Sequence, residues 1–202
     1  MIYIIRHGKT ALNHANLLQG RSDHPLNEDG CQQAIEAGKW LDGQGIVIDK
    51  VYTSPLKRAI QTAELICGNR QAKLDERLIE MDYGPYEGMD LMKPAPEILV
   101  FFSDFINNPA PKGMEPLEDV VRRLGAFLED IRQEAEHNNI LISTHAIAMK
   151  GALEYLTPDS NGSYWSKYIA NCAIYQIDVG NGQYGIPVEI YPVKQTGGDS
   201  DM

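Results

Sequence analysis

The sequence predicts an α/β fold, a three-layer sandwich in which a largely parallel sheet is flanked by helices. Two observations carry this prediction. Short runs rich in β-branched residues recur along the chain, and stretches with apolar residues at helical spacing separate them. Such alternation of strand and helix is typical of a parallel sheet joined by crossover helices.

The expected strands are short apolar runs bounded by turn residues. The first run ends at Arg6-His7-Gly8 and has the length and β-branched character of a buried strand. The full set of expected strands covers residues 2–5, 46–52, 71–74, 140–143, 171–179 and 187–191.

The expected helices begin at recognisable caps. Asn27 is a favourable N-cap, and two acidic residues follow it directly in the sequence. Ser54 precedes a proline that suits the first helical position. Helices are expected from 28 to near 43, from 55 to 66, within 94–113, from 117 to 137 and from 146 to 156, and an irregular loop is expected at 78–88.

Length indicates one domain, residues 1–193, with a cap-like insertion at about 85–115 and a disordered tail at 194–202. For the aromatic-rich part of the insertion, residues 94–113, the alternatives are a cap that selects substrate, ordinary core, or the contact of a homodimer. The structural alternatives are favoured.

Composition narrows the class of protein. The net charge of −10 argues against general nucleic-acid binding and against docking on an anionic membrane. No stretch approaches the roughly 20 apolar residues of a membrane helix. Three widely spaced cysteines suit a reducing compartment, so we expect a cytoplasmic protein. No cluster has metal-ligand spacing, and we expect neither metal nor cofactor.

Polar motifs follow three of the expected strands, where open α/β sheets place their ligands. They are Arg6-His7-Gly8, Ser54 to Arg58, and Ser143-Thr144-His145. Guanidinium groups match phosphate oxygens in bidentate fashion, a neutral imidazole can attack phosphorus, and Gly8 lets the backbone pass close to a ligand. The motifs together predict a site for a small phosphorylated metabolite.

Each motif taken alone has a more ordinary explanation. An Arg-His pair is more often a surface or ion-paired pair, His145 a hydrogen-bonded core histidine, and Arg58 a solvated helix residue. Their common placement at strand ends favours the joint interpretation as a site.

Ordered motifs over residues 2 to 178 resemble the histidine phosphatase superfamily, the phosphoglycerate-mutase-like fold. The resemblance rests on Arg6 to Thr10 with Asn13, then Gln19-Gly20, Asp23, Pro25-Leu26, Gly30, Thr53 to Ala59, Gln61 to Glu64, Leu78 to Gly88, and Ser143 to His145.

The resemblance implies a role for each matching residue. His7 would be phosphorylated, and Arg6, Arg58 and His145 would hold the transferring phosphoryl oxygens. The remaining pocket contacts would come from Asn13, Gln19, Gly20 and the backbone N–H of Ala146.

The resemblance also implies a general acid, Glu80, which would protonate the leaving alkoxide and then accept a proton from water. Asp82 is a competing candidate at similar reach, and a solvated loop carboxylate is the ordinary alternative. Lys9 stands where an acidic residue is usual and Ala146 where glycine is usual, while residues 112–115 match a Gly-Glu motif only loosely, so a role for Glu115 stays open.

Three functions remain open. The favoured one is a phosphatase acting on small phosphomonoesters through phosphohistidine. A cofactor-dependent phosphoglycerate mutase is the second, disfavoured by the compact length and the Gln19-Gly20 pair. A non-catalytic module that binds a phosphate ligand is the third.

Overall fold

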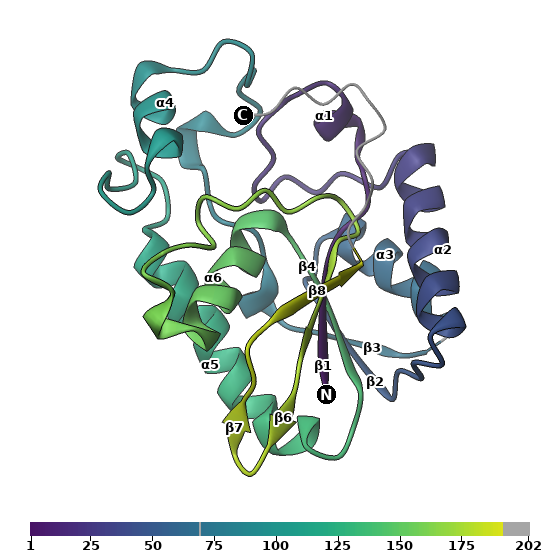
Figure 1. The fold of residues 1–202 in the computed structure, drawn as a ribbon. Helices are drawn as coiled ribbons and strands as arrows, with labels where there is room; N and C mark the ends of the chain where they lie inside the picture. Colours follow the sequence, from purple (N-terminus) through teal and green to yellow (C-terminus); the bar gives the residue numbers. More distant parts are fainter. Residues whose placement is uncertain (69, 192–202) are drawn as a thin grey trace.

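The computed structural model describes residues 1–68 and 70–191. Six strands form one sheet in the order β3-β2-β4-β1-β5-β8 (Figure 1). The strands are β1 (Ile2–Arg6), β2 (Lys50–Thr53), β3 (Ala72–Leu74), β4 (Ile140–Thr144), β5 (Ile174–Ile177) and β8 (Val188–Tyr191), while β6 (Val179–Gly180) and β7 (Gln183–Tyr184) pair separately. The tail expected at 194–202 lies outside the described residues.

The predicted largely parallel sheet is confirmed. β1 pairs parallel with β4, β4 with β2, and β2 with β3, whereas β5 is antiparallel to β1 and β8. Arg6 lies opposite Thr144, and Thr53 lies opposite Ser143. The carboxyl ends of β1, β4 and β2 therefore meet at one edge of the sheet, and the three polar motifs follow there.

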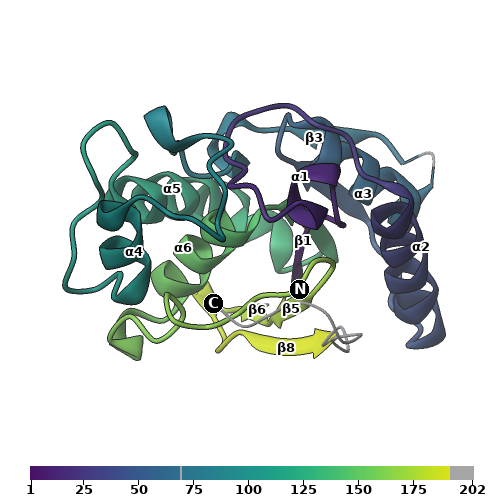
Figure 2. The same cartoon turned by 90° about the horizontal axis from the view of Figure 1, so that it is seen from above.

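Helices cover both faces of the sheet, as Figures 1 and 2 show. α2 (Glu28–Gly43) and α3 (Lys57–Cys67) pack on one face, and α5 (Leu117–Ala135) and α6 (Ala146–Leu156) on the other. α1 (Ala11–His14) and α4 (Pro96–Ser103) lie in the connections, together with the 3₁₀ turns η1 (Glu76–Leu78), η2 (Gly84–Tyr86) and η3 (Pro158–Ser160).

Two hydrophobic cores result, one on each side of the sheet. Successive side chains of a strand point to opposite faces. Ile2 and Ile4 accordingly join the core with α5 and α6, and Tyr3 and Ile5 join the core with α2 and α3. β1 is buried on both faces, which explains its uninterrupted apolar run.

The helix expected to begin at Ser54-Pro55 begins two residues later. α3 starts at Lys57 with Leu56 as its N-cap. The hydroxyl of Ser54 contacts Nε2 of His145 at 2.7 Å and accepts the N–H of Leu56 at 3.3 Å, so it serves the site rather than the helix.

Two further differences concern short elements. The strand expected at 46–52 begins only at Lys50. α1 was not expected in the polar stretch after His7, and it exists because Thr10 and Asn13 cap it reciprocally. Within the described residues, no helix is long and apolar enough to cross a bilayer.

Candidate active site

His7 follows β1 directly and is almost fully buried, with 3% of its surface exposed. Its backbone N–H donates to the Thr144 carbonyl at 2.9 Å, and Asn171 Nδ2 donates to its carbonyl at 2.9 Å. Its ring Nδ1 lies 2.7 Å from the carbonyl oxygen of Gly8. Because a carbonyl can only accept, Nδ1 carries the proton, and Nε2 of the neutral ring keeps its lone pair.

The surroundings of His7 oppose its protonation. Burial lowers its pKa well below the ordinary value, the positive charges of Arg58 and Arg6 lower it further, and the hydrogen bond to Gly8 acts in the opposite direction. His7 is therefore neutral at physiological pH, the state in which an imidazole can act as a nucleophile.

His145 follows β4 and lies beside His7, with ring centroids 5.1 Å apart. Its Nδ1 accepts from Nε of Arg58 at 3.1 Å, and its Nε2 donates to the Ser54 hydroxyl. Burial lowers the pKa of His145 well below its ordinary value, and the charge of Arg58 adds to this effect. His145 is thus a second neutral histidine with a defined tautomer.

Arg58 lies in the first turn of α3 and is fully buried. Its terminal nitrogens donate to the carbonyls of Ser22 at 2.7 Å and Gly20 at 2.5 Å. Burial lowers its pKa to about 10, so it remains a cation at neutral pH. A guanidinium has about five N–H donors, of which these contacts and His145 engage three.

Gly20 supports Arg58 from the opposite loop. Its carbonyl accepts from Arg58, and its N–H donates to the Glu87 carboxylate at 2.9 Å. A Cβ at this position would lie 2.7 Å from the Met81 carbonyl oxygen, so glycine is required by close approach. Gly20 thus acts through Arg58, because both its backbone groups are engaged by the protein.

Arg6 and Gln19 carry buried donors without acceptors. Arg6 donates from its NH1 to the Ile169 carbonyl at 2.5 Å, and Gln19 Oε1 accepts from the Thr10 hydroxyl at 2.8 Å. Nε of Arg6 and Nε2 of Gln19 are the only buried side-chain nitrogen or oxygen atoms in residues 1–68 and 70–191 that have no partner. Unpaired buried donors are rare in folded proteins, and a bound anion would satisfy them.

Asn13 and Ala146 line a cavity of about 480 Å³ beside these residues, and Arg6 lines it as well. Ala146 is the first residue of α6, and its N–H makes no hydrogen bond to any described residue. A free N–H at a helix N-terminus favours an anion. Residues 1–68 and 70–191 hold no group of three His, Cys, Asp or Glu residues arranged to bind a metal.

Glu80 is buried against the beginning of α6. Its Oε1 accepts from the N–H groups of Met81 and Ala148, both at 2.9 Å, and its Oε2 accepts from Ile147 at 3.2 Å. Asp82, the competing candidate, is half-exposed and pairs with Arg21 at 3.2 Å. Of the two carboxylates, Glu80 is the one brought to the helix that follows His145.

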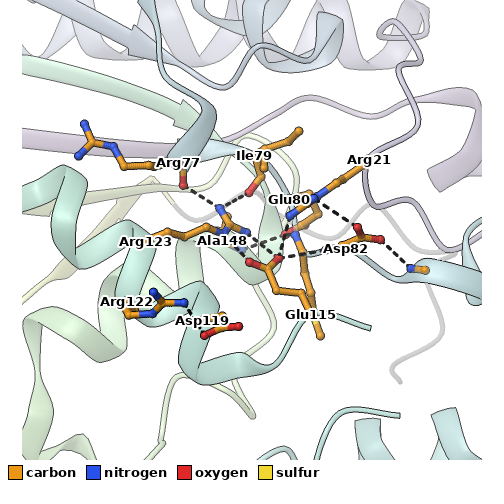
Figure 3. A network of polar contacts seen from close by, with 12 residues as sticks. Arg21, Arg77, Ile79, Glu80, Asp82, Glu115, Asp119, Arg122, Arg123 and Ala148 are labelled. Carbon is orange, nitrogen blue, oxygen red and sulfur yellow. Dashed lines mark hydrogen bonds and ion pairs between the residues drawn. The ribbon is translucent and has the colours of Figure 1, made fainter. Parts of the chain in front are cut away.

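Arg123 holds the segment that carries Glu80 (Figure 3). Its NH1 donates to the carbonyls of Arg77 at 2.7 Å and Ile79 at 2.6 Å, and its Nε donates to Glu115 at 2.8 Å. Glu115 also accepts the N–H of Asp82 at 3.1 Å. Glu115 therefore anchors the segment that carries Glu80, through its contacts with Arg123 and Asp82.

Sequence reasoning assigned no role to Arg123, Glu87 or Thr62. Thr62 accepts the N–H of Gly8 at 3.0 Å and donates to the Arg58 carbonyl at 2.7 Å. A signal for Arg123 exists, because it lies three residues after Val120 and four before Phe127, on the apolar face of α5. Glu87 accepts the backbone N–H groups of residues 20–22 and the hydroxyl of Ser22, and backbone contacts leave no sequence pattern.

Comparisons with known proteins agree with this geometry. The family model described as histidine phosphatase superfamily (branch 1) matches residues 2–188. A 2,3-bisphosphoglycerate-dependent phosphoglycerate mutase of Bradyrhizobium diazoefficiens is 32% identical, with 79% of this chain and 83% of the mutase covered. Phosphoserine phosphatase 1 of Hydrogenobacter thermophilus is 28% identical, with coverage of 82% and 80%.

A solved structure adds a neighbour with a ligand. A mutant phosphoserine phosphatase of Entamoeba histolytica in complex with phosphoserine superposes with a TM-score of 0.78 at 26% identity, covering 94% of each chain. The same organism's enzyme is also known in complex with 3-phosphoglyceric acid, with a TM-score of 0.77.

Proposed function

Because the chain belongs to the histidine phosphatase superfamily, we propose that it hydrolyses small phosphomonoesters through a phosphohistidine intermediate on His7. The observation that carries this proposal is the state of His7. The Gly8 carbonyl fixes the proton on Nδ1, and burial with two arginines keeps the ring neutral, so Nε2 is a free nucleophile.

In the first step, Nε2 of His7 forms a bond to phosphorus while the bond from phosphorus to the ester oxygen breaks. Arg6 and Arg58 stabilise charge on the phosphoryl oxygens, together with the N–H donors of Gln19 and Ala146. His145 acts through Arg58, because Arg58 and Ser54 engage its two ring nitrogens. Glu80, in its protonated form, gives its proton to the leaving oxygen. Oε2 is the better placed of its two oxygens, because it accepts one backbone N–H and Oε1 accepts two.

In the second step, a water oxygen attacks phosphorus and the nitrogen–phosphorus bond breaks. The carboxylate of Glu80 takes the proton from water, and His7 returns to its neutral form as inorganic phosphate leaves. The proposed chemistry needs no metal.

A mutase is the second candidate, because relatives named as mutases match at 32% identity. It would share the first step, and a substrate hydroxyl would then replace water as acceptor. The sequence pair Gln19-Gly20 and the compact length favour hydrolysis. A non-catalytic phosphate-binding module is the third candidate, and the intact set of catalytic residue types argues against it.

The test is hydrolysis of p-nitrophenyl phosphate in chelator by the wild type, by His7→Ala and by the exposed control His137→Ala, with primer-dependent phosphoglycerate mutase activity assayed in parallel. We expect chelator-resistant hydrolysis that falls about 10³-fold or more in His7→Ala and is kept in His137→Ala. Mutase turnover without hydrolysis would support the mutase. No activity in either assay would support the non-catalytic phosphate-binding module.

Glu80→Gln separates acid catalysis from binding. It should slow an alkyl phosphate by about 100-fold or more, since the alkoxide needs a proton. The same variant should slow p-nitrophenyl phosphate far less, because nitrophenolate leaves without one. An equal effect on both esters would contradict the role of Glu80 as general acid.

A further inference from the structure

A lysine without an acidic partner lines the cavity beside the phosphate site. Lys150 lies on α6 and is partly buried, and its Nζ donates to the Trp165 carbonyl at 2.7 Å. The ammonium group also lies 5.3 Å from the centre of the Phe105 ring. Within the described residues, no carboxylate lies within ion-pair distance of it.

The lining of the cavity suits an anionic ligand. None of the described residues that line it is acidic, although the chain has a net charge of −10. Its polar lining includes three cationic side chains, Arg6, Lys9 and Lys150. The rest of the lining is largely apolar and includes Leu17, Leu91, Phe102 and Phe105. An ion pair is stronger in such surroundings than in water.

The two groups that α6 presents to the cavity indicate a short occupant. Ala146, with its free N–H, and Lys150 both line the cavity from this helix. They are four residues apart, which corresponds to about 6 Å along the helix axis. A phosphoryl group at Ala146 and a second anion near Lys150 would therefore be joined by a chain of a few carbons.

We infer that Lys150 binds a second anionic group, a carboxylate, on the leaving group of the substrate. This inference rests on the proposed function, since it names the substrate class of the same site as phosphate esters of short hydroxy acids. Lys150 then acts as a specificity residue, and the apolar wall packs against the carbon chain between the two anions.

The test compares 3-phosphoglycerate with glycerol 3-phosphate, which has a hydroxymethyl group in place of the carboxylate. Dissociation constants are measured by calorimetry in the His7→Ala background, where turnover should be too slow to disturb the measurement. We expect tighter binding of 3-phosphoglycerate, and the preference should fall about tenfold or more in Lys150→Met, as for the loss of a charged hydrogen bond. Lys150→Arg keeps the cation and should keep the preference.

Lys167→Met is the matched control, because the Lys167 ammonium also lies over aromatic rings, at 5.0 Å from Tyr175, but is outside the cavity. It should leave the preference unchanged. A structural role for Lys150 would weaken both ligands equally and leave their ratio intact, which would overturn the inference. Equal binding of the two ligands to the protein with Lys150 intact would also overturn the inference. A preference that is lost in Lys9→Met but kept in Lys150→Met would overturn it as well. Failure of the proposed function would appear separately, as absent hydrolysis by the wild type.

The pH dependence of the preference gives a second readout. Burial lowers the pKa of Lys150 to about 8, the charge of Arg6 lowers it further, and Glu80 opposes this. Lys9, on the same cavity, is the other cation near the proposed carboxylate. The preference should therefore decline between pH 7 and pH 9 and persist in Lys150→Arg. A parallel decline in the arginine variant would also overturn the inference.

Discussion

The Nε–H of Arg58 donates to Nδ1 of His145 at 3.1 Å, and both side chains are completely buried. A ring nitrogen that accepts from an arginine cannot carry a proton, so the remaining nitrogen of neutral His145 is a donor. Arg58 thus fixes the tautomer of His145 in addition to supplying positive charge. A lysine at position 58 would supply the charge without this planar contact.

Arg123→Met should reduce turnover of alkyl phosphates, because it removes three of the contacts that hold the segment before Glu80. We expect a fall of about 10- to 100-fold in kcat, as for a small displacement of a catalytic group. Turnover of p-nitrophenyl phosphate should fall less than turnover of alkyl phosphates, as is also expected for Glu80→Gln. Arg122→Met is the control, since that side chain is 78% exposed and pairs only with Asp119 among the described residues. Equal losses in the two arginine variants would contradict a positioning role for Arg123.

Glu87→Gln should weaken the support of Arg58. The carboxylate accepts the N–H groups of Gly20, Arg21 and Ser22, and the carbonyls of Gly20 and Ser22 hold the guanidinium. We expect a loss of about 1–3 kcal/mol of stability and a higher KM for every phosphate ester. Glu97→Gln, at a carboxylate that accepts only from Tyr86 in the described chain, serves as the control in urea unfolding and steady-state kinetics. An unchanged KM in Glu87→Gln would argue against this support.

Stability should fall as the pH falls below about 6.5, the ordinary pKa of histidine. The folded-state pKa values of His7 and His145 are lowered, so the unfolded chain takes up protons in this range and the folded protein does not. Each histidine then removes up to about 1.4 kcal/mol per pH unit. The free energy of unfolding, measured in urea between pH 5 and pH 8, should therefore depend less steeply on pH in His7→Asn. Identical slopes in the two proteins would refute the lowered pKa of His7.

Gly8→Ala should destabilise the protein although glycine here has an ordinary backbone conformation. An added Cβ would lie 2.4 Å from the Gly30 carbonyl oxygen in the first turn of α2. Overpacking of this kind costs about 1–3 kcal/mol. Gly43→Ala has nothing within 4 Å of the new Cβ and should be neutral or stabilising by up to about 1 kcal/mol. Urea unfolding of both variants tests the contrast, and equal midpoints would contradict it.

The sequence was informative where periodicity or caps carry the signal. α6 occupies 146–156 as predicted, and the Asn27 cap accepts the Gly30 N–H at 2.8 Å. The polar motifs after β1, β2 and β4 could be brought together before any coordinates, because neighbouring parallel strands end at one edge.

Predictions that depend on competition between partners were less accurate. Ser54 resembles an N-cap in sequence, but the hydroxyl faces a buried histidine from another strand, which no local pattern reveals. At Gly8 the structure adds a second reason for glycine that no local pattern reveals, since an added Cβ would meet the backbone of α2. The sequence did not identify Lys150 as a site residue. A single lysine in an apolar helix becomes informative only once the residues that line the cavity around it are known.

The helix α4 faces two ways. Ile98 and Phe101 are buried in the core on the α5 and α6 side, while Leu99 and Phe102 line the cavity. The residues proposed to grip phosphate come from the sheet edge and the helices behind it, whereas a large part of the wall that would meet the leaving group comes from one contiguous segment. In the proposed arrangement α6 serves both ends of the ligand, through Ala146 and Lys150, while much of the apolar wall comes from residues 91–105. Exchanging residues 91–105 should therefore reshape the apolar wall while leaving Arg6, Ala146 and Lys150 in place.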